Sequence, residues 1–201
     1  YHYNLGGSIF AQTLNQVGSI APEFRNIDNF PKIFNYIQKL LKENKILAGH
    51  DRSDGGLIST IVEMCISSYV GCELSIKSDV DYISYLFNEE LGLIIEVENQ
   101  YLEEIIENLS NYCPTIKIGN TTKERKIIIK YNYENIIKND VIYFWKQWEH
   151  SSYMLEKKQC SLNLVEEEYN SIDTRIVPYS IINEEILKLI EVPSYIEQSL
   201  P

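Results

Sequence analysis

A polar block over residues 50–56 holds the side chains of this sequence that are best suited to chemistry. It reads His-Asp-Arg-Ser-Asp-Gly-Gly, with the apolar residues 46–48 before it and a helix-like stretch over 57–69 after it. Carboxylate and phosphate oxygens together bind Mg²⁺, and glycine backbone at the start of a helix can offer N–H groups to an anion. The block therefore predicts a site for a phosphate group and its metal ion.

Structural roles compete with binding roles inside this block. Asp54, directly before the glycines, is a good helix N-cap, and this role is favoured over direct ligation. Arg52 could pair with Asp54 or with another nearby acid, and a surface pair of this kind contributes only about 0–1 kcal/mol. His50 could orient Asp51 or simply pack against its neighbours. The residue types leave both alternatives for His50 open.

A second polar run, Asn88-Glu89-Glu90, precedes an apolar stretch. Its side chains could contact a substrate or cap a turn, and the residue types alone favour the turn. Glu89 and Glu90 are not expected to work as an acid–base pair, because adjacent residues of a strand face opposite sides.

The periodicity of apolar residues predicts a mixed α and β domain around these blocks. Helices are expected at 8–18, 29–44, 56–69, 101–109, 135–158 and 180–191, and strands at 72–76, 91–97, 115–118 and 126–131. Ser8 is the expected cap of the first helix, and Asp28 or Asn29 that of the second, which has Pro31 in its first turn.

The strand pattern gives further expectations about arrangement. The stretch 91–97 is nearly all apolar, which predicts a central strand. Strands 115–118 and 126–131 are expected to be joined by a polar turn at 119–120. Trp145 and Trp148 stand three residues apart on the expected final helix, where they are expected to act as core or interface anchors.

The composition excludes some classes of function. A net charge of −11 argues against broad nucleic-acid binding, which needs a basic surface. No apolar run approaches the roughly 20 residues of a membrane span. The chain begins at Tyr1 without a Met or a signal pattern, which is typical of a piece cut from a longer polypeptide.

The cysteines indicate a reducing, cytoplasmic setting. The four cysteines form no C-x-x-C pair, and no His stands at zinc-ligand spacing. Cys65 falls in an apolar helical pattern and is expected in the core. A cysteine nucleophile would need a His partner, and no such motif is present.

Four blocks in order resemble one family. Leu5-Gly6-Gly7-Ser8 with Ala11-Gln12, the 50–56 block, Phe87 to Gly92 and Trp148 to Met154 are similar to segments of phosphoribosylformylglycinamidine synthase. The resemblance covers residues 4–160 and is most specific at 50–56. It implies an α+β fold, a three-layer α/β/α domain of the aminoimidazole ribonucleotide (AIR) synthetase C-terminal type, in the second of two such positions.

The resemblance also implies the activity and the partners. The family converts formylglycinamide ribonucleotide to its amidine in purine biosynthesis. ATP activates the amide oxygen by phosphorylation, and ammonia from glutamine displaces the phosphate. N-terminal-type domains and a glutaminase domain of the same polypeptide would be partners, and the ligands would be small nucleotides. Residues 1–160 would be the AIR-synthetase-related domain, and residues 161–201 a solvated linker toward the glutaminase.

Two site residues are carried over from the family. Asp51 matches a magnesium ligand, and Ser53 matches a residue that contacts ATP or ADP. No catalytic residue is assigned, because the family's nucleotide site that includes this domain is an auxiliary one. Two alternatives stand beside this interpretation: a structural module that holds nucleotide without turnover, and a relative of the same fold, such as AIR synthetase or selenophosphate synthetase. The 88–92 block and the closing Trp helix disfavour the same-fold relatives.

We expect this chain alone to show neither synthetase nor glutaminase activity. It has no Gly-x-Cys-x-Gly nucleophile turn, and the resemblance places most nucleotide ligands in other domains. Assays of glutamine hydrolysis and of ATP turnover with the purified chain test this. Release of ammonia from glutamine above the uncatalysed rate would contradict it.

Overall fold

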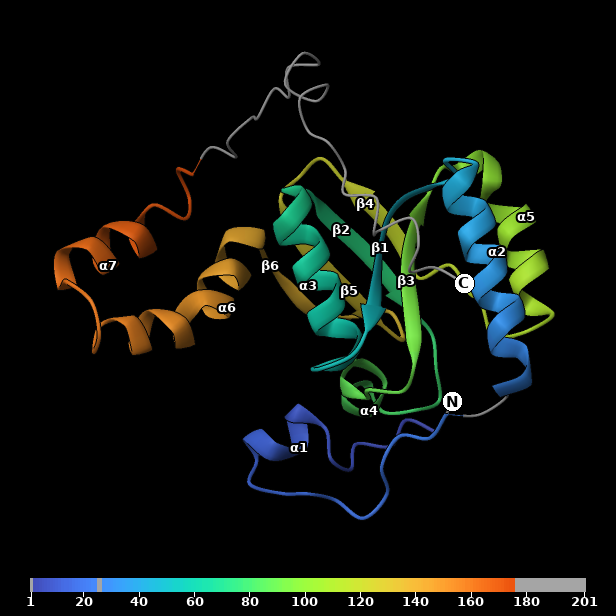
Figure 1. Cartoon of the computed structure of the whole chain (residues 1–201), viewed down its shortest axis with the longest axis horizontal. Coiled ribbons are helices and arrows are strands. Elements are labelled where there is room, and N and C mark those ends of the chain that lie inside the picture. Colours follow the sequence, from blue (N-terminus) through green and yellow to red (C-terminus); the bar gives the residue numbers. More distant parts are fainter. Residues whose placement is uncertain (1, 25–26, 176–201) are drawn as a thin grey trace, which may run out of the picture.

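The computed structural model describes residues 2–24 and 27–175, and it has the α+β fold expected from the sequence. Figure 1 shows the helices on both sides of a central set of strands. The helices are α1 (Ile9–Thr13), η1 (Ile27–Asn29, 3-10), α2 (Phe30–Lys42), α3 (Gly56–Ser68), α4 (Tyr82–Phe87), α5 (Asn99–Ser110), α6 (Val141–Glu156) and α7 (Leu162–Asn170). The strands are β1 (Ile46–Arg52), β2 (Gly71–Ile76), β3 (Gly92–Val97), β4 (Gly119–Thr122), β5 (Lys126–Tyr131) and β6 (Glu134–Asp140).

The strands form two sheets. One has the order β4-β2-β5-β6, in which β2 and β5 are parallel and the other pairs are antiparallel. The other is the antiparallel pair β1-β3. The Thr121 hydroxyl of β4 donates to the Glu96 carboxylate of β3 at 2.8 Å, so the two sheets lie edge to edge.

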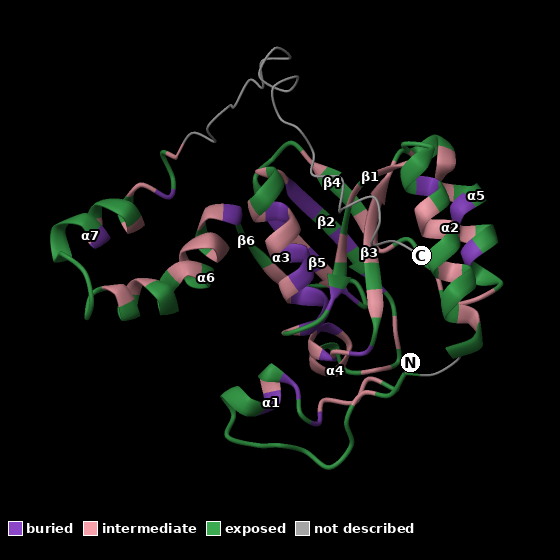
Figure 2. Ribbon diagram, in the orientation of Figure 1, coloured by how far each residue is buried: buried purple, intermediate pink, exposed green. Residues whose placement is uncertain are grey.

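Two hydrophobic cores lie on opposite faces of the β1-β3 pair. Directly opposed residues of an antiparallel pair share a face. His50 opposes Ile94, which packs on the core formed by α3, α4, β2 and β5. Gly49 opposes Ile95, which packs on the core between α2 and α5. Helices α2 and α5, the strands, and helices α3 and α4 therefore form three layers. Figure 2 shows buried residues on the helices and strands of these layers.

The two helices nearest the polar block end where the backbone leaves the right-handed region. Helix α2 begins after Asn29 with Pro31 in its first turn, and it ends before Asn44, whose φ is 54°. Helix α3 begins at Gly56 and ends before Tyr69, whose φ is 58°. The predicted positions of both helices are confirmed, but the expected cap of α2 is wrong, because Asn29 makes no side-chain hydrogen bond to the helix and donates to the backbone oxygen of Tyr112 instead.

The core contains the two thiols nearest each other in the sequence. Cys65 of α3 and Cys72 of β2 are buried, which confirms the expectation for Cys65. The hydrogen bond between the Cys72 and Cys65 thiols, together with burial, raises the pKa of the Cys72 thiol. Cys72 therefore packs as a neutral thiol.

The prediction of a helix over 135–158 was wrong at its start. Residues 134–140 form strand β6, which pairs with β5. The chain reverses at Asn132 and Tyr133, whose φ values of 46° and 73° are those of a type I′ hairpin turn. The usual Asn-Gly signal is absent from this turn, and the apolar residues 136 and 137 fit a helix and a strand equally well.

Two further strand predictions were wrong. Residues 115–118 are not a strand, and 119–120 lie inside β4, which pairs with β2 rather than with β5. Strand β3 is not central, because within the described part of the chain its ladder hydrogen bonds run to β1 alone. Its apolar character comes instead from facing a core on each side.

The chain ends also differ from the expectations. Ser8 does cap α1, but the helix has only five residues, and Leu14 and Val17 are exposed. The solvated linker expected after residue 160 begins with α7, a helix that packs on α6 and buries Val165. The helix expected at 180–191 lies outside the described residues. Within those residues no helix is both long enough and apolar enough to span a membrane.

We expect Gly56→Ala to lower the free energy of unfolding by about 2–4 kcal/mol. The φ of Gly56 is +71°, and an added Cβ would lie 2.7 Å from the backbone oxygens of Leu86 and Asn88. Gly7→Ala is the control, because its φ is +76° but an added Cβ meets nothing within 4 Å, and a loss of about 1–2 kcal/mol is expected. Urea unfolding of both variants measures the difference, and equal losses would contradict the close approach.

Candidate functional site

The polar block forms the end of β1 and the loop that leads into α3. Asp51 is the next-to-last residue of β1 and opposes Leu93 of β3. Its side chain is 69% exposed, and its backbone oxygen accepts a hydrogen bond from the Thr60 hydroxyl of α3 at 3.1 Å. The carboxylate is therefore open to a ligand while its backbone is held by the helix.

A line of polar contacts reaches Asp51 from α6. The Trp148 indole N–H donates to Glu63 of α3 at 3.2 Å, and the other oxygen of Glu63 lies 3.3 Å from His50 Nε2. His50 Nδ1 lies 2.7 Å from the backbone oxygen of Asp51 and 3.5 Å from its carboxylate. Of the two roles left open for His50, the structure supports the orienting one.

Arg52 turns away from solvent. Its side chain is buried, and its Nε donates to the backbone oxygen of Glu90 at 2.6 Å. The guanidinium therefore ties the start of the loop to the segment before β3.

The expected N-cap role of Asp54 is wrong. Gly55 occupies the N-cap position of α3, with a φ of +80° and no side-chain hydrogen bond to the helix. The left-handed glycine turns the chain by itself, and Asp54 is left exposed beside it.

The backbone N–H groups expected to be open at the start of α3 are partly taken. The Gly56 N–H donates to the backbone oxygen of Ser53 at 2.9 Å, and the Gly55 N–H donates to the Glu89 carboxylate at 2.8 Å. Ser53 itself is exposed, and none of the described residues hydrogen-bonds its hydroxyl. The side chains of Ser53 and Asp51, rather than the glycine backbone, are thus what the loop offers to a ligand.

Glu89 and Glu90 are the residues whose roles the sequence did not define. One oxygen of Glu89 accepts from the N–H groups of Gly55 and Ile9, and one oxygen of Glu90 accepts from those of His2 and Tyr3. They cap turns, as the residue types favoured, but the turns belong to distant segments. The signal for these contacts in the sequence was the predicted helix start at Ser8, because the first N–H groups of a helix need acceptors.

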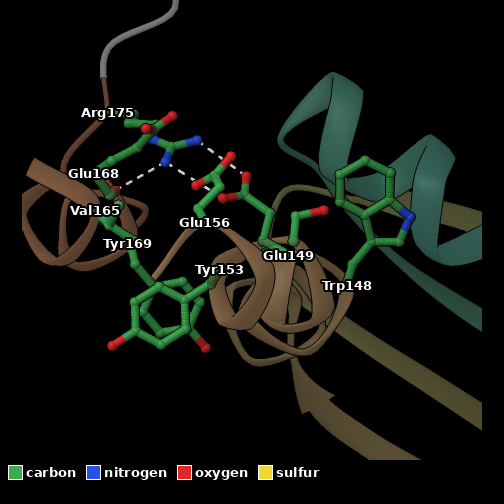
Figure 3. Close-up of a pocket in the computed structure, with 9 residues that line it drawn as sticks. Trp148, Glu149, Tyr153, Glu156, Val165, Glu168, Tyr169 and Arg175 are labelled. Carbon is green, nitrogen blue, oxygen red and sulfur yellow. Dashed lines mark hydrogen bonds and ion pairs between the residues drawn. The ribbon is translucent and has the colours of Figure 1, made fainter. Parts of the chain in front are cut away.

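The loop borders a large hollow of about 1290 Å³. His50, Asp51, Arg52 and Glu90 line it, together with apolar residues of α2, α3, β1, β3 and α5. A smaller hollow of about 200 Å³ lies between α6 and α7, away from the loop. Figure 3 shows its stacked rings of Tyr153 and Tyr169, and the ion pair in which Arg175 approaches Glu149 at 3.0 Å.

Asp51 and Asp54 are the exposed carboxylates of this loop. Across residues 2–24 and 27–175, no three His, Cys, Asp or Glu side chains are grouped to hold a metal. Mg²⁺ takes six oxygen ligands, with several of them from water or phosphate. Asp51 therefore fits as one ligand of a site whose other donors come from phosphate, water or another domain.

The fold and the loop define an α+β domain with a candidate phosphate site at the end of a strand. Its sequence matches the protein family described as "AIR synthase related protein, C-terminal domain" over residues 10–132. This match covers more than half of the 201 residues. The chain belongs to this family.

Longer proteins contain a similar stretch. The phosphoribosylformylglycinamidine synthase of Dictyostelium discoideum is 35% identical over 188 residues, which cover 84% of this chain and 14% of that protein. An Arabidopsis thaliana protein named "Probable phosphoribosylformylglycinamidine synthase, chloroplastic/mitochondrial" is 34% identical over 176 residues, covering 87% of this chain and 12% of that protein. The chain thus spans 12–14% of the length of these relatives.

One solved structure with a similar chain is described as "T. maritima PurL complexed with ATP". Its TM-score is 0.49 and its sequence identity 14%, and the likeness covers 54% of this chain and 20% of that one.

We expect Asp81→Ala to lower stability by about 1 kcal/mol and Asp54→Ala to change it by less than about 0.5 kcal/mol. Asp81 caps α4 by accepting from the Ser84 N–H at 2.9 Å, while Asp54 caps nothing. Urea unfolding of both variants at neutral pH compares them.

The same cap has a pH dependence. The hydrogen bond from the Ser84 backbone holds the pKa of Asp81 below its usual value. The contribution of this hydrogen bond to the free energy of unfolding is present at neutral pH and is lost as the pH falls through the lowered pKa of Asp81. Asp81→Ala should therefore weaken the acid dependence of unfolding, and an unaltered acid limb would count against the cap.

Proposed function

We propose that this chain works as one domain of a phosphoribosylformylglycinamidine synthase, an ATP-dependent C–N ligase of purine biosynthesis. The observation that carries the proposal is the alignment of proteins with this name along 84–87% of the chain at 34–35% identity. The full reaction uses glutamine-derived ammonia and needs nucleotide-binding and glutaminase domains that lie elsewhere in such a polypeptide. The proposed compartment is the cytoplasm.

The proposed role of this domain is to help hold a Mg–ATP or Mg–ADP group. The Asp51 carboxylate binds the magnesium ion, and the Ser53 hydroxyl donates to a phosphate oxygen. The magnesium ion supplies positive charge that neutralises the phosphates. The exposure of both side chains supports this role, and so do the contacts through which Glu63 and His50 hold Asp51.

We further propose that this nucleotide site is auxiliary rather than catalytic. Asp51 has a supporting His, and Glu89 and Glu90 are engaged with backbone N–H groups. A bound nucleotide that never turns over would stabilise the assembly of domains. Residues 1–160 would form the domain, and 161–201 would lead toward the glutaminase.

Asp51→Asn tests the metal role in the whole polypeptide. An amide is a poorer ligand for a hard cation than a carboxylate. Thermal unfolding with and without saturating Mg–ADP should show a stabilisation smaller by about 2–4 kcal/mol, if the wild type holds ADP at hundreds of times its dissociation constant.

Asp54→Asn is the matched control for this test. It removes the same charge from an exposed neighbour of Ser53 that lies outside the proposed ligand set. The two variants should therefore differ in their response to Mg–ADP but not in its absence. An equal response of both variants would contradict the assignment of Asp51.

A further inference from the structure

The loop that carries Ser53 is held at both ends, by contacts with the consecutive residues Glu90 and Glu89. At its start, Arg52 donates to the backbone oxygen of Glu90 at 2.6 Å. At its end, the Gly55 N–H donates to the side chain of Glu89 at 2.8 Å. Ser53 and Asp54 span the gap between these anchors, so the position of the Ser53 hydroxyl depends on both.

The Glu89 carboxylate also binds a second segment. The same oxygen that accepts from Gly55 accepts from the Ile9 N–H at 2.9 Å. Gly55 is the N-cap residue of α3, and Ile9 is the first residue of α1. Both N–H groups belong to helix starts, which favour a negative charge. One carboxylate therefore joins the loop to the start of α1.

The support beneath Glu89 is firm. Asn88 is fully buried, and its side-chain amide donates to the backbone oxygens of Ser84 and Tyr85 at 2.7 and 2.9 Å. An added Cβ on Gly56 would clash with the backbone at 86–88, so the loop and this segment are in direct contact. Glu89 thus follows a buried residue that is hydrogen-bonded to α4, on a segment that packs against the start of α3.

We propose that Glu89 is a positioning residue for the nucleotide site, which holds the Ser53 loop in its binding conformation through the Gly55 N–H. This rests on the proposed function, in which Ser53 contacts the nucleotide. A loop held in place before binding gives a ligand higher affinity than one that must be ordered by it. The carboxylate acts through the backbone and does not itself touch the nucleotide.

Two variants of Glu89 separate positioning from other roles. Glu89→Ala removes the acceptor, and Glu89→Gln keeps a carbonyl oxygen for both N–H groups while removing the charge. Glu124→Ala is the control, because its side chain is 79% exposed in the turn before β5. Calorimetric titration of the whole polypeptide with Mg–ADP measures affinity, and hydrogen–deuterium exchange of peptides covering residues 8–12 and 53–57 measures the contacts.

We expect Glu89→Ala to weaken Mg–ADP binding about tenfold and to speed exchange in both peptides, as loss of a hydrogen bond to a charged group implies. Glu89→Gln should stay within about threefold of the wild type, since only the charge assistance is lost. Glu124→Ala should match the wild type in both measurements.

Each of the following results would overturn either the positioning role of Glu89 or the proposed function. Faster exchange in Glu89→Ala with unchanged Mg–ADP affinity would remove the positioning role and leave the proposed function standing. Tighter binding in both Glu89 variants would mean that the carboxylate repels phosphate instead of placing the loop. A wild-type polypeptide that binds no Mg–ADP would overturn the proposed function, and the role of Glu89 with it.

Discussion

The contact between Gly56 and the backbone of residues 86–88 determines where the polar loop lies. No side chain fits there, and the glycine also supplies the left-handed backbone that starts α3. Once α3 is seated against the end of α4, Arg52 and Gly55 are brought beside Glu90 and Glu89. The exposed positions of Asp51 and Ser53 follow from this one approach, because Arg52 between them and Gly55 after them are already bound.

The β1-β3 pair holds the strand that carries Asp51. The two faces of this pair pack on different cores, so β1 is held in place although it does not belong to the larger sheet. At its end the helices α2 and α5 no longer cover it, and Asp51 and Leu93 come into the open. Charged groups that leave solvent lose hydration energy, which must be offset by pairing. The exposed Asp51 carboxylate keeps its hydration while the hydrogen bond from Thr60 holds its backbone.

The parts of the fold that the sequence predicts are those governed by local rules. Helix α2 follows from the spacing of Ile33, Ile37 and Leu40, and its ends follow from Pro31 and Asn44. The polar block was placed correctly before a helix for the same reason. Strand β6 was not, because the turn at Asn132 and Tyr133 takes a left-handed conformation without glycine and is fixed by pairing with β5. The bonds of Glu89 join residues 34 and 80 positions away, and no spacing rule reaches that far.

The use of backbone N–H groups as the partners of Glu89 has an evolutionary consequence. Ile9 contributes no side-chain atom to this bond, and its own side chain is partly exposed. Mutations can therefore accumulate freely at position 9, with proline as the exception, because proline lacks the N–H. Position 89 has no such freedom, since only a side chain of the right length and acceptor type reaches both amides. Lineages descended from this sequence would show drift at one end of the bond and constancy at the other.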